Sequence, residues 1–184
     1  GTATIIDDDN TPSLSINDVT TTDESAANAT FTATLSAASG QTVTVDYASS
    51  NGTATAGADY TTARGTLTFS AGETTKTFTV PVLADTTDES NETVTLTLSN
   101  ASNASISDAT GTLTITDDDS APSLSINNVT TTDESAANAT FTVTLSAASG
   151  QTVTVDYASS DGTATAGADY TDTSGRLTFA AGET

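Results

Sequence analysis

Carboxylates are the side chains in this sequence that could do chemistry. The 184 residues include 24 Asp and Glu but only 3 Lys and Arg, which gives a formal net charge of −21, and they include no His and no Cys. Without Cys or His the chain can form no disulfide, zinc finger, thiol nucleophile or imidazole base. So few basic residues cannot neutralise phosphates, which excludes a nucleic-acid partner. Acid–base catalysis and cation binding are the remaining options for the carboxylates.

The carboxylates of one long stretch cluster at a few turns. They are Asp23, Glu24, Asp59, Asp85, Asp88, Glu89, Glu92, Asp117, Asp118 and Asp119. If the fold brings these turns to one end, two like charges ~4 Å apart repel by about 4 kcal/mol at an effective dielectric near 20. A divalent cation relieves this repulsion at neutral pH, and Ca²⁺ takes about six to eight oxygens in a more flexible geometry than Mg²⁺. The sequence therefore predicts Ca²⁺ as the cofactor, and the alternative is a hydrated acidic loop end without a metal.

The elements that must position these acids are β-strands. Apolar residues alternate with Thr, as in 31–35 and 94–98, which is typical of strands with one buried face, and no stretch has a helical period. The predicted strands cover 13–19, 29–37, 42–50, 65–70, 75–84, 92–100 and 109–116. We therefore expect an all-β fold, a seven-stranded Greek-key β-sandwich of immunoglobulin type. In such a sandwich the turns after the first, third and fifth strands share one end. Pro81 places the fifth strand at an edge or a bulge.

Alternation also predicts the residues of the core. The inward side chains should be Leu14, Ile16, Phe31, Leu35, Val43, Val45, Tyr47, Leu67, Phe69, Phe78, Val80, Val82, Val94, Leu96, Leu98, Leu113 and Ile115. No run of apolar residues is long enough to cross a bilayer, so we expect no membrane insertion in this segment.

A repeat of 110 residues organises the chain. Residues 12–74 and 122–184 differ at 8 of 63 positions, and residues 1–10 resemble 111–120. The expected domains are 1–10, the last strand of a preceding repeat; 11–120, a complete repeat; and 121–184, the first four strands of the next repeat. This period suits a tandem array of sandwich domains.

Several motifs together resemble those of Calx-beta domains, which are known from sodium–calcium exchangers, an integrin and many bacterial surface proteins. They are 51–60 (NGTATAGADY), 65–73 (GTLTFSAGE), the acidic loop that ends at Glu92, and 115–119 (ITDDD). The resemblance covers the whole repeat. It implies tandem Calx-beta sandwiches that bind Ca²⁺ at their loop ends. One departure is Ala84, where the calcium-binding exchanger domain has a carboxylate.

The resemblance also implies a set of metal ligands. In the complete repeat these are Glu24, Asp59, Asp85, Glu89, Glu92, Asp117, Asp118 and Asp119. In the next repeat Glu134 and Asp169 match, and Asp7, Asp8 and Asp9 would belong to the site of the preceding repeat.

We expect no enzyme activity and no small-molecule substrate. Glycosidases also use paired carboxylates, but in clefts lined with aromatic rings, and the 4 Tyr and 5 Phe of this chain are mostly predicted core. Near-identical repeats also argue against a unique active site.

The expected function is a calcium-binding structural repeat of an extracellular filament, stalk or adhesin at the cell surface, in which Ca²⁺ rigidifies the joints between domains. Its partners would be neighbouring repeats of the same chain and, in a fibre, identical chains. The alternatives are a regulatory calcium-sensor pair and an adhesive module that binds a surface ligand directly.

The second repeat has no counterparts of strands five to seven in this sequence. We expect either a chain that continues through both ends or completion of each domain by a neighbouring chain. The strand inventory favours continuation, since nothing here can spare strands five and six.

Overall fold

Every regular element of the described chain is a β-strand. The computed structural model describes residues 1–4, 6, 8–26, 28–133 and 138–184. Their packing divides them into two units, which we describe separately: 1–85 with 91–117, and 86–90 with 118–184. Within the described ranges there is no helix long and apolar enough to span a bilayer. The predicted all-β class is confirmed.

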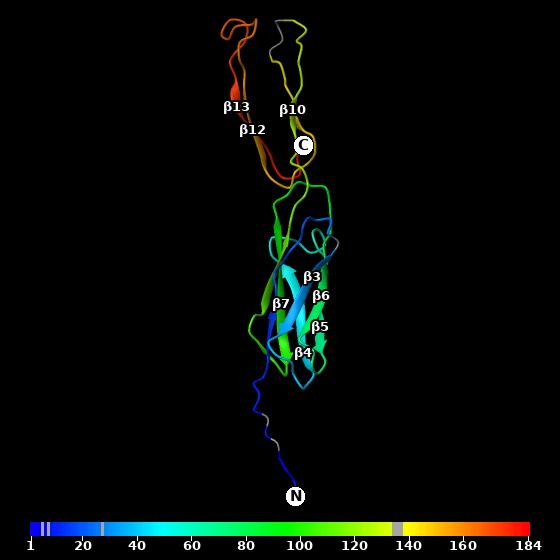
Figure 1. Ribbon diagram of the computed structural model, residues 1–184. Coiled ribbons are helices and arrows are strands. Elements are labelled where there is room, and N and C mark those ends of the chain that lie inside the picture. The colour runs from blue at the N-terminus through cyan, green and yellow to red at the C-terminus, as the bar shows by residue number, and fades with distance from the viewer. Residues whose placement is uncertain (5, 7, 27, 134–137) are drawn as a thin grey trace. The chain divides into compact units, whose positions relative to one another are not determined.

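Four strands form one sheet of the first unit. Its order is β6 (Thr75–Pro81), β3 (Asn28–Leu35), β1 (Ser13–Ile16) and β8 (Ser105–Ile106) (Figure 1). β3 pairs antiparallel with both β1 and β6, with Phe31 opposite Phe78, while β8 adds to β1 in parallel. Because β6 is an edge strand and ends at Pro81, the missing N–H of proline interrupts no central ladder, as the sequence predicted.

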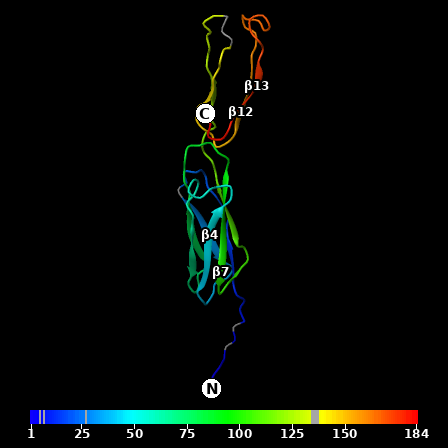
Figure 2. The same cartoon turned by 180° about the vertical axis from the view of Figure 1, so that it is seen from behind.

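Five strands form the facing sheet. Its order is β2 (Val19–Thr20), β9 (Thr110–Ile115), β7 (Glu92–Ser102), β4 (Val43–Asn51) and β5 (Arg64–Phe69). The pairs β4–β5, β4–β7 and β7–β9 are antiparallel, and β2 joins β9 in parallel. Figure 2 shows β4 beside β7 from behind. The two sheets make the predicted immunoglobulin-like sandwich.

The first predicted strand, 13–19, is wrong as a single element, because it divides between the two sheets as β1 and β2. Two side chains stabilise the crossing. Asn17 Oδ1 accepts a hydrogen bond from the Thr32 N–H at 2.7 Å, and Asp18 Oδ1 accepts one from the Thr112 N–H at 2.7 Å. Each side chain thus replaces a backbone partner where the chain leaves one sheet for the other.

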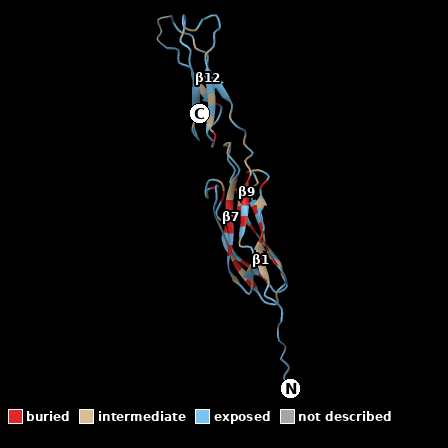
Figure 3. Ribbon diagram, turned by 90° about the vertical axis from the view of Figure 1, so that its left-hand side faces the viewer, coloured by how far each residue is buried: buried red, intermediate tan, exposed pale blue. Residues whose placement is uncertain are grey.

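The core of the first unit lies between these sheets, where Figure 3 shows the buried residues of β7 and β9 in red. Every predicted core residue is buried except Tyr47, which is half-buried. The prediction missed Tyr60, which is fully buried, and the small residues Ala29, Ala33, Ala54 and Ala63.

The second unit holds two separate hairpin-like sheets. One pairs β10 (Leu124–Ile126) with β11 (Val143–Leu145), and the other pairs β12 (Val153–Ala158) with β13 (Ser174–Phe179). Their registers repeat those of the first unit after 110 residues: Leu124 faces Leu145 as Leu14 faces Leu35. The described residues among the first ten belong to no strand. Their assignment to a preceding repeat, like the other domain boundaries, stays a prediction.

Candidate metal centre

The loop that carries Asp59 is built around a buried tyrosine. Tyr60 is fully buried and donates its hydroxyl hydrogen to Asn51 Oδ1 at 2.8 Å, and the same oxygen accepts the Ala56 N–H at 3.0 Å. Asp59 Oδ2 accepts the Thr55 N–H at 2.6 Å, which closes the turn. The Asn and Tyr of the motif, nine residues apart, therefore position the carboxylate of Asp59. The next repeat has Asp161 and Tyr170 at the equivalent positions, also nine residues apart. This recurrence was the signal in the sequence that the two residues support the turn.

One group of carboxylates forms beside this loop. Within the first unit, one carboxylate oxygen of Asp59 lies within 4.8 Å of one of Asp85; Asp59 is half-buried and Asp85 is exposed. The two residues come from the 51–64 connection and from the loop after β6. Glu89, also a predicted ligand, is half-buried in the second unit.

A second group forms at the end of β9. Within the first unit, one carboxylate oxygen of Glu24 lies within 4.8 Å of one of Asp117, and Glu24 is only 7% exposed. Asp119, also a predicted ligand, is half-buried in the second unit. Thr116 fixes this strand end: its N–H donates to Thr21 Oγ1 at 3.0 Å, and its hydroxyl donates to the Thr21 carbonyl at 2.8 Å. These bonds hold Asp117 beside the loop that carries Glu24.

Asp117 has a carboxylate oxygen that no described residue satisfies. Its Oδ1 exposes less than 1 Å² and has no hydrogen-bond donor within the described part of the chain. A buried carboxylate oxygen without a partner costs free energy, and a cation beside it would remove that cost. An all-carboxylate donor set suits a hard cation such as Ca²⁺. The residues present therefore fit the predicted metal.

The other predicted ligands lie outside these two groups. Glu92 is half-buried at the start of β7, and Asp118 is exposed, as are Asp8 and Asp9. Asp7 and Glu134 lie outside the described residues. In the second unit Asp169 Oδ2 accepts the Thr165 N–H at 2.9 Å, which repeats the turn of Asp59. The ligand role of every one of these residues stays a prediction.

Asp88 was expected in the acidic cluster but makes a different contact. Within the second unit its Oδ2 accepts a hydrogen bond from Ser149 Oγ at 2.7 Å, and its carbonyl accepts the Gly150 N–H at 2.9 Å. Ser149 is buried. The carboxylate of Asp88 is thus used to hold a turn.

Hydrogen bonds shift several nearby pKa values. The Ser25 hydroxyl, which donates to Asp23 at 2.6 Å, lowers the pKa of that carboxyl. In the second unit Asp161 replaces Asn51 and accepts the Tyr170 hydroxyl, which lowers the pKa of Asp161 and raises that of Tyr170 to about 12. Both shifts favour an ionised carboxylate paired with a protonated donor.

Comparisons with known proteins agree with this architecture. The family model of the Calx-beta domain matches residues 7–119 and 117–184. No curated protein sequence matched the chain.

Three solved structures share the fold, each at 23% identity. The "Apo-form Calx CBD1 domain" has a TM-score of 0.56 and covers 60% of this chain and 100% of its own. The "calcium binding domain CBD12 of CALX1.1" has a TM-score of 0.55, and the match covers 92% of this chain and 71% of that structure's chain. "CBD12 from CALX1.2" has a TM-score of 0.56, and the match covers 92% of this chain and 72% of that structure's chain. The family match spans nearly the whole sequence, and the chain belongs to the Calx-beta domain family.

Proposed function

We propose that this chain is a calcium-binding structural repeat of an extracellular filament, stalk or adhesin. The observation that carries the metal part is the buried Asp117 Oδ1, which has no donor among the described residues and lies beside the buried Glu24. Ca²⁺ supplies positive charge to such oxygens when bound. The role is non-catalytic, and no small-molecule substrate is proposed.

The spacing of the terminal aspartates supports a role at the joint between repeats. Asp119 is followed by Ser120, Ala121 and Pro122, which begins the matched segment of the next repeat. Ca²⁺ held by Asp117 and Asp119 would restrain this short connection, which Pro122 already stiffens by fixing φ. The proposed partners are therefore neighbouring repeats of the same chain and, in a fibre, identical chains.

A regulatory calcium-sensor pair is the second candidate. The resemblance to two CBD12 structures, which covers 92% of this chain, supports it. The near identity of the repeats supports the structural role instead, because sensors usually need domains of unequal affinity. Small-angle scattering of the chain with and without Ca²⁺ separates the two: a sensor changes its mean interdomain angle, whereas a stalk narrows its range of angles.

Calorimetry tests the metal site itself. Compared with the chelator-treated protein, Ca²⁺ should raise the melting temperature of the first unit. At a Ca²⁺ concentration 100 times the Kd, the free energy of unfolding should increase by about 2.7 kcal/mol. Asp117→Asn should remove most of this increase. The control Asp108→Asn also removes one negative charge, but from an exposed turn outside both carboxylate groups. An unchanged melting temperature and no bound Ca²⁺ would exclude the proposal.

A further inference from the structure

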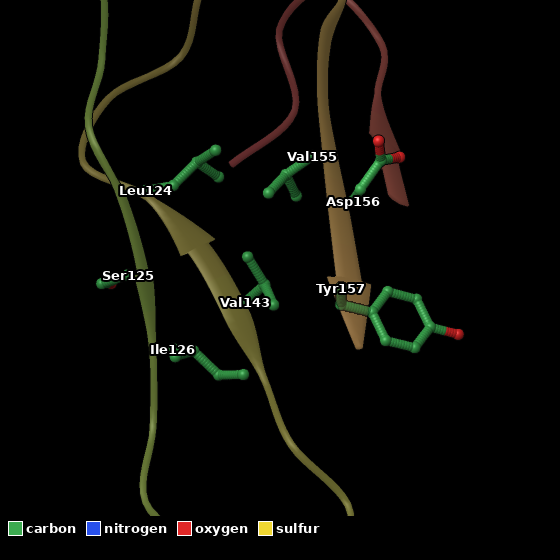
Figure 4. A pocket seen from close by; sticks show the side chains of 7 residues that line it. All are labelled: Leu124, Ser125, Ile126, Val143, Val155, Asp156 and Tyr157. Atoms are coloured by element: carbon green, nitrogen blue, oxygen red, sulfur yellow. The ribbon is translucent and has the colours of Figure 1, made fainter. Parts of the chain in front are cut away.

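The acidic loop after β6 packs with a turn of the next repeat. Residues 86–90 lie in the connection between β6 and β7, yet they belong to the second unit. There they contact the turn 146–151 (SAASGQ), which connects β11 to β12. Figure 4 shows Val143 of β11 and Val155 of β12, the two strands on either side of this turn. We call the packing of 86–90 on this turn the loop–turn contact.

Hydrogen bonds from both backbone and side chains form the loop–turn contact. The Asp88 carbonyl accepts the Gly150 N–H at 2.9 Å, and Asp88 and Ser149 form a parallel β-bridge. The Ser149 hydroxyl lies 2.7 Å from Asp88 Oδ2, to which it donates, and 3.1 Å from the Asp88 carbonyl. Ser149 is only 1% exposed. Because a buried hydroxyl without an acceptor costs free energy, Ser149 depends on the oxygens of Asp88.

The same turn in the first repeat is a reference without this loop. Residues 36–41 also read SAASGQ. Ser39 Oγ accepts the Gln41 N–H at 3.0 Å and its carbonyl accepts the Gly72 N–H at 2.9 Å, and Ser149 makes both equivalent bonds at the same distances. Ser39 is half-buried, however, whereas Ser149 is buried. The turn is therefore local in origin, and the loop–turn contact is added to it.

The glycine of the turn leaves room for the loop. A Cβ on Gly150 would lie 2.5 Å from Oε1 and 2.7 Å from Cγ of Glu89. A Cβ on Gly40, the equivalent residue, would meet no atom within 4 Å apart from its chain neighbours. Neither glycine is among those with positive φ. The requirement for glycine at 150 therefore comes from the loop that packs against it and not from the backbone conformation.

We propose that the SAASGQ turn is a docking surface for the acidic loop of the preceding repeat, and that Asp88 and Ser149 form a joint between repeats that needs no metal. The loop supplies a carboxylate and a backbone carbonyl, and the turn supplies a hydroxyl and a glycine N–H. Because the turn contains no Lys or Arg, hydrogen bonds and not ion pairs make the recognition. This joint is distinct from the calcium-dependent one proposed above, since all its donors and acceptors are protein groups.

Amide exchange of Gly150, measured by NMR on the full 184-residue chain in chelator, tests the contact. Asp88→Ala should speed this exchange about threefold to tenfold, the effect of one lost hydrogen bond. Asp88→Asn keeps an oxygen acceptor and should exchange like the parent chain. Ser149→Ala should add little to Asp88→Ala, because both variants remove the same bond. The control Asp108→Ala removes an acidic side chain from an exposed turn and should have no effect.

A distance measurement tests whether the contact restrains the joint. The chain has no Cys, so spin labels can be attached at Thr112→Cys and Thr178→Cys, which are exposed strand positions in the first and second unit. In chelator, Asp88→Ala and Gly150→Ala should each broaden the distribution of distances between the labels. Gly40→Ala, the matched change in the equivalent turn, should leave the distribution as in the labelled parent.

Three results would overturn this joint. They are unchanged exchange of Gly150 in Asp88→Ala, equal distance distributions in the two glycine variants, and protection of Gly150 that appears only when Ca²⁺ is added. The last result would assign the loop to the metal site. Calcium calorimetry on the same samples reports the metal site separately, so absent calcium binding with a persistent loop–turn contact would reject that site and support this joint.

Discussion

The two units place nearly the same residues in opposite surroundings. Residues 12–74 and 122–184 differ at only 8 positions, yet Phe31 is fully buried whereas Phe141 is 54% exposed. Polar and apolar residues alternate in both, although Arg176 replaces Thr66 and Val143 replaces Ala33. What differs is the partner: β6, β7 and β9 cover the first unit. Burial is therefore a property of the assembled sheets, and the strand sequence only makes one face available for it.

Local turns show the reverse behaviour, because they form alike in both units. Asp59 and Asp169 each accept an N–H four residues earlier, at 2.6 and 2.9 Å. Gly57 and Gly167 both adopt positive φ, 92° and 81°, where glycine carries no steric penalty. Contacts within ten residues need no partner sheet, so these turns are alike whether the sandwich is closed or open.

The largest expected difference in stability is between alanine variants of two equivalent phenylalanines, Phe31 and Phe141. Phe31→Ala should lower the free energy of unfolding of the first unit by about 3–5 kcal/mol, because it empties a packed site. Phe141→Ala should cost the second unit about 1 kcal/mol or less, since its ring is more than half exposed. Denaturant titration with hydrogen exchange by segment measures both. Equal losses in the two units would show that the second core is closed.

Calcium should distinguish the two equivalent aspartates. Asp59→Asn should reduce the Ca²⁺-dependent stabilisation of the first unit by up to about 2 kcal/mol at saturating metal, because the carboxylate of Asp59 lies beside that of Asp85. Asp169→Asn should leave the Ca²⁺-dependent stabilisation of the first unit unchanged, because Asp169 lies in the second unit. Asparagine retains an oxygen for the N–H of Thr55 or Thr165, so both turns persist. A reduced calcium response of the first unit in the Asp169 variant would contradict the assignment.

Two matched glycines test how freely a tyrosine can move. A Cβ on Gly65 would lie 2.9 Å from the Tyr47 hydroxyl, and one on Gly175 would lie 2.8 Å from the Tyr157 hydroxyl. Tyr47 is held by its stacking on Phe78, so Gly65→Ala should destabilise the first unit by about 1–3 kcal/mol. Tyr157 can rotate away, and Gly175→Ala should cost about 0.5 kcal/mol or less. Thermal unfolding of both variants measures the difference, and a greater cost at Gly175 would contradict it.

The smallest effect concerns an exposed ion pair. Arg176 replaces Thr66 and contacts Asp156 at 2.6 Å, and this contact lowers the pKa of Asp156 below its usual 3.8. Its stabilising contribution is therefore present above about pH 3.8 and disappears as the pH falls through the lowered pKa. Arg176→Thr should raise the pKa of Asp156 measured by NMR and change stability very little, because the pair is exposed.

Asp46 is the internal reference for that titration. Hydrogen bonds from Thr66 and Asn100 lower its pKa in the first unit. It should titrate identically in Arg176→Thr and in the parent chain. A shift of Asp46 in the variant would mean that the substitution acts at long range.

The sequence predicted the strands closely because each has the strict alternation that one buried face requires. It predicted 29–37 and 92–100, and the structure has Asn28–Leu35 and Glu92–Ser102. It failed at 13–19, because alternation does not record which sheet a strand joins; the crossing depends on hydrogen bonds that the side chains of Asn17 and Asp18 accept from the N–H groups of Thr32 and Thr112. Tyr60 was missed for a related reason: it follows a loop motif and has no alternating neighbours.

For the candidate site, the sequence identified the acidic residues and the turns that carry them. Residue types, repeat length and local hydrogen bonds are contained in short stretches of chain, so the sequence by itself determined them. Only the tertiary structure decided that Asp59 lies beside Asp85 and Glu24 beside Asp117, and that Asp88 accepts a hydrogen bond from Ser149. Distances of a few ångström between carboxylates depend on how far-apart loops pack, and the same dependence on distant strands leaves Phe141 exposed where Phe31 is buried.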